Sequence, residues 1–102
     1  MKKEELLGMI QSANVEIYIH EKGKLKAIAK VFNDYLEWNG WRIQESKFGD
    51  KLWVDYPCYK QGTEYAKAIY FKDEEIKSIV DLKIMEKYEE EVLKKEAENM
   101  TF

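Results

Sequence analysis

The stretch Lys24-Leu-Lys-Ala-Ile-Ala-Lys-Val-Phe32 alternates apolar and polar side chains, and it is followed by Asn39-Gly-Trp-Arg-Ile43 and Leu52-Trp-Val-Asp-Tyr-Pro57. A period of two residues puts every second side chain on one face of a strand, so these pieces predict β-strands. Pro57 ends the last strand because proline lacks a backbone N–H. Together the three pieces predict the middle of an antiparallel sheet.

The residues before this stretch predict one more strand. Val15, Ile17 and Ile19 share one face, and the polar residues between them take the other. The segment Glu21-Lys-Gly-Lys24 then supplies a glycine, which a tight hairpin turn favours because glycine adopts a positive φ. The strand containing Val15 should therefore pair antiparallel with the strand that begins at Lys24.

Later turns and strands follow from the same pattern. Asn33-Asp34 predicts a turn, Tyr35 to Glu45 a long strand that bends at Asn39-Gly40, and Phe48-Gly-Asp-Lys51 another turn. Beyond Pro57 we expect a loop from Cys58 to Glu64 and a further alternating segment from Tyr65 to Phe71. The sheet should then have about five strands.

Helices are expected at the two ends of the chain. Lys3 to Ala13 has apolar residues at spacings of three and four, and the segment 73–98 has them over a much longer stretch. Asp73 is positioned to cap the second helix. Its apolar stripe consists of Ile76, Ile79, Val80, Ile84, Met85, Tyr88 and Val92. We expect a single α+β domain over 1–102: an N-terminal helical extension (1–13), a sheet (14–71) and a C-terminal helix (73–98).

Composition narrows the class of protein. The chain has 102 residues, of which 45% are hydrophobic and 36% charged, as in an ordered domain. No apolar run reaches the roughly 18 residues of a membrane span, and the first residues lack the apolar core of a secretory signal, so we expect a cytoplasmic protein without membrane contact. One cysteine and one histidine make a disulfide, a metal site or a bound cofactor unexpected.

Catalytic residues are not indicated. His20 falls on the polar face of its strand, where a surface role is the simplest interpretation. Cys58 is the only thiol; Lys60 nearby makes a reactive thiolate conceivable, but an inert thiol fits a single cysteine better. Neither a glycine-rich phosphate loop nor a Walker-type motif is present. We therefore expect a protein without enzymatic activity.

Charge is distributed unevenly. Met1 to Phe71 carries 11 basic and 10 acidic residues, and Lys72 to Phe102 carries 6 and 10. Binding to phosphate would therefore need a local group of cations. The candidates are Lys26, Lys30, Arg42 and Lys60, with Trp41 as a base-stacking residue. Alternatively, the first two lysines protect an exposed strand from edge pairing, and the tryptophan belongs to the core or to a dimer contact.

The tryptophans of the third strand bear on this choice. Trp38 and Trp41 would point to opposite faces of a regular strand, so at least one would be exposed unless a bulge intervenes.

From Val15 to Val92, the chain resembles the SpoVG family of bacterial septation and regulatory proteins. Asn39-Gly-Trp-Arg-Ile43 is similar to the family's Asn/His-Gly/Asp-Ile-Arg-Val/Ile stretch, and Leu52-Trp-Val-Asp-Tyr-Pro57 to its Leu-Phe-Val-x-Met-Pro strand. The resemblance implies a homodimer with a curved antiparallel sheet and a terminal helix. It also implies a regulator that binds DNA or RNA.

The chain departs from that family at two places. After the proline the family has a serine and two basic residues, and here the positions read Cys58, Tyr59 and Lys60, so only Lys60 carries over as a cation. The family's His-Pro before the last helix is replaced within Ala68 to Phe71. A relative with these changes could keep the scaffold and use it for another partner.

The alternative hypothesis is a protein-binding module, such as an inhibitor or adaptor from a mobile element. Its contact surface would be the acidic helix, which carries Glu86, Glu89, Glu90 and Glu91 and would engage a basic partner. A homodimer is expected under either hypothesis, because a small sheet leaves edges that a two-fold partner can pair.

Overall fold

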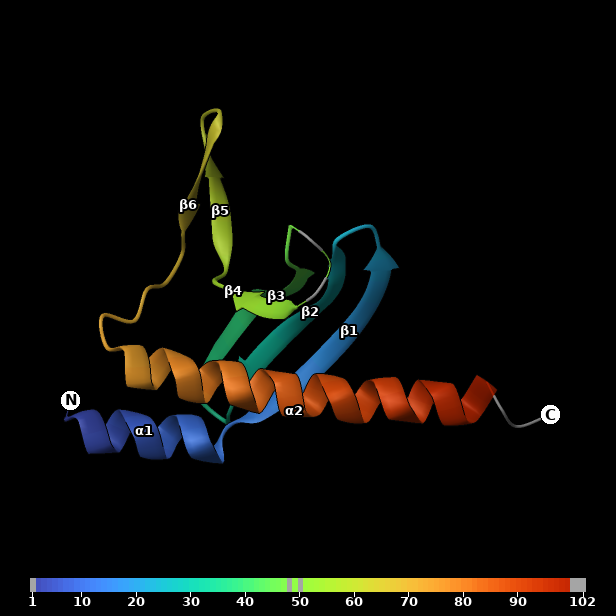
Figure 1. The fold of residues 1–102 in the computed structure, drawn as a ribbon. Helices are drawn as coiled ribbons and strands as arrows, with labels where there is room; N and C mark the ends of the chain where they lie inside the picture. The colour runs from blue at the N-terminus through green and yellow to red at the C-terminus, as the bar shows by residue number, and fades with distance from the viewer. Residues whose placement is uncertain (1, 48, 50, 100–102) are drawn as a thin grey trace.

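The structure is a computed structural model, and it describes residues 2–47, 49 and 51–99. It is an α+β fold, as the sequence predicts (Figure 1). The elements in chain order are α1 (Lys3–Ser12), β1 (Asn14–Lys22), β2 (Leu25–Phe32), β3 (Glu37–Glu45), β4 (Leu52–Asp55), β5 (Cys58–Gln61), β6 (Glu64–Lys67) and α2 (Glu74–Asn99).

Strands β1 to β4 form one antiparallel sheet in the order β1-β2-β3-β4, so each strand lies beside the one that follows it in the chain. The register places Tyr18, Ile28, Arg42 and Asp55 in one row across the four strands. Helix α2 covers one face of the sheet, and α1 lies beside its first half (Figure 1). The opposite face of the sheet carries no helix, and we call it the open face.

A bulge at Gly40 controls which way the tryptophans of β3 point. Ala29 pairs with Trp41 and the next residue of β2 pairs with Asn39, so Gly40 is the extra residue, at φ 95°. Only glycine adopts this φ readily. This extra residue shifts the alternation of side chains by one, so Trp38 and Trp41 both face the helix side. The sequence predicts them on opposite faces unless a bulge intervenes, and this is that bulge.

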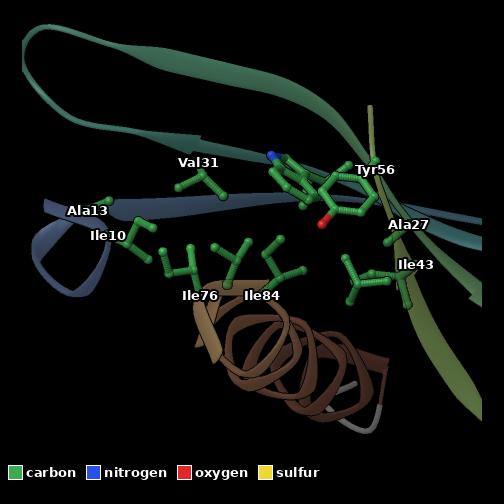
Figure 2. Close-up of a cluster of buried hydrophobic side chains, with 12 residues drawn as sticks. Ile10, Ala13, Ala27, Val31, Ile43, Tyr56, Ile76 and Ile84 are labelled. Atoms are coloured by element: carbon green, nitrogen blue, oxygen red, sulfur yellow. The ribbon is translucent and has the colours of Figure 1, made fainter. Parts of the chain in front are cut away.

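The core lies between the sheet and the two helices (Figure 2). Trp41, Ile43 and Ile84 have no exposed surface, and Ile10 of α1 is 1% exposed. The full set of buried residues is Ile10, Ala13, Ala27, Ala29, Val31, Trp41, Ile43, Val54, Tyr56, Ile76, Val80 and Ile84. Burying this apolar surface is the main term that stabilises so small a domain.

Residues 58–67 differ from the expectation. Instead of a loop followed by a fifth strand of the sheet, β5 and β6 form a separate two-stranded hairpin, which stands away from the body in Figure 1. We call residues 58–67 the arm. Gly62, at φ 67°, allows the tight turn between its strands. The prediction was wrong because β5 is polar on both faces and so shows no apolar alternation.

Both helices lie close to the predicted ranges. The backbone N–H groups of Glu75 and Ile76 donate to Asp73 Oδ1 at 2.9 and 3.3 Å, which confirms the cap. Ile76, Val80 and Ile84 are the buried part of the predicted stripe. Within the described residues, neither helix is long and apolar enough to cross a membrane. The turn predicted at 48–51 includes Phe48 and Asp50, which lie outside the described residues.

Candidate nucleic-acid interface

Two of the four predicted cations, Lys30 and Arg42, lie on the open face of the sheet, where each alternates with buried residues of its strand. Lys26 does not share that face, so the prediction that it does was wrong. The register shifts at Lys26, which makes it the extra residue of a bulge in β2. Its side chain lies near Glu45 and near Tyr88 of α2, on the helix side of the sheet.

Each of these cations has an acidic partner. Lys26 Nζ lies 3.7 Å from the Glu45 carboxylate. Lys30 Nζ lies 3.0 Å from Glu16 and 3.6 Å from Glu37. Local attraction for phosphate is correspondingly reduced, because a phosphate would have to compete with carboxylates already in place.

The ion pair of Lys30 and Glu16 also shifts protonation. Its hydrogen bond to Glu16 raises the pKa of Lys30 above the ordinary lysine value. The same bond to Lys30 lowers the pKa of the Glu16 carboxyl. Both groups therefore remain charged over a wider pH range, and the pair persists at neutral pH.

Arg42 is the most firmly held of the three cations. Its guanidinium donates to the Asp55 carboxylate, which is the cross-strand partner of Arg42, and lies 3.2 Å from Cys58 Sγ. The side chains of Arg42 and Asp55 are 32% and 21% exposed. Arg42 thus links the sheet to the first residue of the arm through one nitrogen, Nη2, while its Nε is buried without a hydrogen-bond partner among the described residues.

Trp41 does not lie on the surface. Its side chain is fully buried and stacks on Phe71 with ring centroids 6.1 Å apart, with Tyr56 on another side at 5.5 Å. A base-stacking role for Trp41 is therefore a wrong prediction, because no base can reach the ring without opening the core. The bulge at Gly40 is the cause, since it turns Trp41 inward together with Trp38. Among the tryptophans it is Trp53 of β4 that is exposed, at 46%.

Lys60 lies apart from the other three cations, on β5 of the arm. Its side chain is exposed, and among the described residues it has no ion-pair partner. The base of the arm is anchored: Ala68 N donates to Pro57 O at 2.7 Å, and Lys67 Nζ lies 5.0 Å from the ring centres of Tyr56 and Tyr70. The four predicted cations therefore do not form one continuous strip.

Sequence reasoning missed a second group of lysines, in the turns at one end of the sheet. Lys24, Lys47 and Lys51 are exposed and, within the described part of the chain, form no ion pair. Backbone hydrogen bonds of 2.8 Å, from Glu45 N to Lys24 O and from Ser46 N to Lys51 O, hold the two turns side by side. We call these three residues the turn lysines. The three lysines belong to two turns that are far apart in the sequence. Only the pairing of β2 with β3 brings these turns together.

The acidic residues of α2 divide into two pairs. Glu90 and Glu91 both contact Lys87 and Lys94 at 3.2 to 3.5 Å, and the bond to Lys94 is the main cause that lowers the pKa of Glu90. Glu86 and Glu89 are exposed and take part in none of these contacts. The predicted acidic surface is therefore half neutralised by the helix's own lysines.

Neither the histidine nor the cysteine lies in a catalytic arrangement with other described residues. His20 is exposed on the open face, and Cys58 contacts Arg42 and the carbonyl oxygen of Tyr56. Among the described residues, no group of three histidine, cysteine, aspartate or glutamate side chains could hold a metal ion. The chemistry available at the surface is that of charge pairing, hydrogen bonding and aromatic contact.

No protein-family model matches this chain, and no curated protein matches it either.

Proposed function

We propose that this chain is a SpoVG-like dimeric regulator that binds DNA or RNA through lysines of its turns and arm. The order and spacing of its strand sequences support the resemblance on which this proposal rests. The observation that carries it is a contrast between two groups of cations. Lys26 and Lys30 are held by carboxylates, whereas the turn lysines and Lys60 form no ion pair with any residue that the structure describes.

The placement of these lysines favours the same surface. The arm and both turns point away from the two helices in Figure 1. Helix α2 contains nine acidic residues and five lysines, so it carries a net negative charge on the other side of the molecule. A polyanion approaching from the side of the turns would meet lysines that are not ion-paired within residues 2–47, 49 and 51–99, and it would stay distant from the acidic helix.

Salt dependence tests the proposal. We would measure binding of the full chain to a short duplex and to a single strand while the salt concentration is varied. The logarithm of the affinity should fall with the logarithm of the salt concentration, by about 0.7 to 0.9 per phosphate contact. Undetectable binding to both strands at about 50 mM salt, where phosphate contacts are strongest, would reject the function.

A matched pair of variants locates the surface. Lys47→Gln with Lys60→Gln removes two unpaired lysines and should reduce the salt slope by about one for each. Lys26→Gln with Lys30→Gln removes the same charge from lysines that carboxylates already hold, so it should change the slope much less. Equal effects of the two variants would show that ion pairing does not decide which lysines meet phosphate.

A second candidate function rests on the outer side of α2. Leu82 and Leu93 are 60% and 65% exposed, and with Glu86 and Glu89 they form one stripe at spacings of four, three and four. Such a stripe suits a protein partner with a basic and apolar groove. Reversal of Glu86 and Glu89 to lysine should then remove bound proteins from a pull-down, whereas reversal of Glu90 and Glu91 should have less effect. An unchanged profile in both would count against this candidate.

A further inference from the structure

The arm is a β-hairpin without a packing surface of its own. Its two strands pair with each other and not with the four-stranded sheet. An isolated two-stranded hairpin is only marginally stable in water, and stability requires a third strand or a packed face. Tyr59 and Tyr65 on the arm are 51% and 73% exposed. Contact with a further surface would therefore stabilise the arm beyond its anchored base.

The overall dimensions agree with a protomer that is completed by another molecule. The radius of gyration is 14.9 Å, whereas a compact domain of this length has a value of about 13 Å. The projecting arm contributes to this excess, as Figure 1 shows. Its anchored base, at Pro57 and Ala68, fixes the direction in which the arm is presented.

We propose that the outer edge of β6 pairs antiparallel with the same edge of a second copy of this chain. The hydrogen bond from Ala68 N to Pro57 O shows which backbone groups are already used. Because orientation alternates along a strand, Glu64 and Ala66 also direct their N–H and C=O groups toward β5. The N–H and C=O groups of Tyr65 and Lys67 therefore face the free edge, where an added strand can bond to them.

Charge favours β6 over β5 as the shared edge. Antiparallel pairing of two β6 strands about a two-fold axis allows two registers. In one, Tyr65 lies opposite its own copy, and in the other it lies opposite the partner subunit's Lys67. In both registers Glu64 lies opposite an alanine, so like charges do not meet. Pairing two β5 strands in the same way would set Lys60 opposite its own copy, or opposite the partner subunit's Cys58. Because Cys58 lies beside the Arg42 guanidinium, cations would come close together in both cases. A lysine on an edge strand is a known protection against pairing.

A second copy fits the arm better than nucleic acid does. The arm carries two lysines and one glutamate, which is too little charge for binding dominated by phosphate contacts. Its exposed tyrosines are typical of protein interfaces. Pairing through β6 also leaves Lys60 on the outer strand, so the interface does not depend on whether the proposed nucleic-acid contact exists.

The test is the mass of the full chain in solution, without nucleic acid, by light scattering over a wide concentration range. The wild-type chain should be a dimer. Tyr65→Lys should make it monomeric, because either register then sets two cations opposite each other. Tyr59→Lys adds the same charge to the other strand of the arm and should leave the dimer intact. Circular dichroism would check that both variants fold, as expected for residues this exposed.

Cross-linking gives an independent reading of the edge. With Cys58 replaced by serine, Tyr65→Cys should form an intersubunit disulfide on oxidation if Tyr65 lies opposite its own copy, and Tyr65→Cys with Lys67→Cys should form one in the other register. Tyr59→Cys should form none in either register. A monomeric wild-type chain, or a dimer that Tyr65→Lys does not affect, would overturn the proposal. A wild-type monomer whose affinity for nucleic acid is reduced by Tyr65→Lys would also overturn the proposal, because the arm would then contact nucleic acid instead of a second copy.

Discussion

The backbone of Gly40 packs against Pro57: a Cβ placed on Gly40 would lie 3.6 Å from Pro57 Cβ. This contact joins the bulge of β3 to the residue at which the chain leaves the sheet for the arm. It allows the same glycine to turn Trp41 into the core and to support the base of the arm.

Gly40→Ala should therefore destabilise the protein by backbone strain rather than by a clash, because 3.6 Å is an ordinary contact distance. A positive φ costs a residue with a Cβ about 1 to 2 kcal/mol. Urea denaturation would measure the loss in the free energy of unfolding. Gly8→Ala is the matched control: it lies in α1 with open space around it, and it should raise stability by about 0.5 to 1 kcal/mol.

Trp41→Ala should cost about 3 to 5 kcal/mol of unfolding free energy, because it leaves a cavity between Tyr56 and Phe71. Trp41→Phe should cost less, since the indole Nε1 is buried without a hydrogen-bond partner and its removal relieves that penalty. Thermal or urea unfolding would rank the variants. The exposed Trp53→Ala should stay within about 0.5 kcal/mol of the wild type, and a cost similar to that of Trp41→Ala would contradict the assigned burial.

Arg42→Ala should lower the free energy of unfolding by about 1 to 3 kcal/mol, because it leaves the half-buried Asp55 carboxylate without its charged donor. Arg42→Lys should restore only part of this, since an ammonium cannot reproduce the planar set of guanidinium donors. Lys26→Ala breaks a looser ion pair of 3.7 Å and should cost about 0 to 1 kcal/mol. Equal losses at the two positions would show that Arg42 has no special role.

Acid should weaken the N-terminus of α2 through Asp73. The ammonium of Lys3, 2.9 Å away, is the main cause that holds the pKa of Asp73 below its usual value of 3.8. Because the folded-state pKa is the lower one, this carboxylate stabilises the fold above pH 3.8, and its contribution disappears as the pH falls through the folded-state value.

Asp73→Asn keeps a capping oxygen but cannot titrate, so its unfolding free energy should fall less between neutral pH and pH 3 than that of the wild type. Urea unfolding at several pH values would measure this slope. Glu16 and Glu90, whose pKa values are also lowered, remain in the variant, so some acid sensitivity should persist. A slope identical to that of the wild type would mean that the contact with Lys3 does not hold Asp73 ionised. Asp34→Asn, in an exposed turn, is the control.

Much of the fold could be predicted because its signals are local. The alternation in β2 and the stripe from Ile76 to Ile84 each follow from a few neighbouring residues, and both occur where expected. The arm could not be predicted in this way. Cys58 to Gln61 pairs only with β6 and covers no core, so its side chains show no apolar period.

The candidate interface was predictable only in part. Alternation alone correctly placed Lys30 on the open face of β2, but it missed the bulge that turns Lys26 to the other side. It could not show that Glu16, Glu37 and Glu45 would neutralise them, because those acids lie on other strands and meet the lysines only through register. For the same reason the turn lysines did not stand out, since their proximity depends on pairing between residues far apart in the chain.

The sequence by itself determined strands β1 to β4, the helices, the Asp73 cap and the bulge at Gly40, since periodicity, capping and backbone conformation act over a few residues. Only the tertiary structure decided that Trp41 is buried, that Arg42 holds Asp55, and that the arm stands outside the sheet. These outcomes depend on which distant residues face each other once the sheet is paired and α2 is packed on it, and a single amino-acid sequence does not display that register.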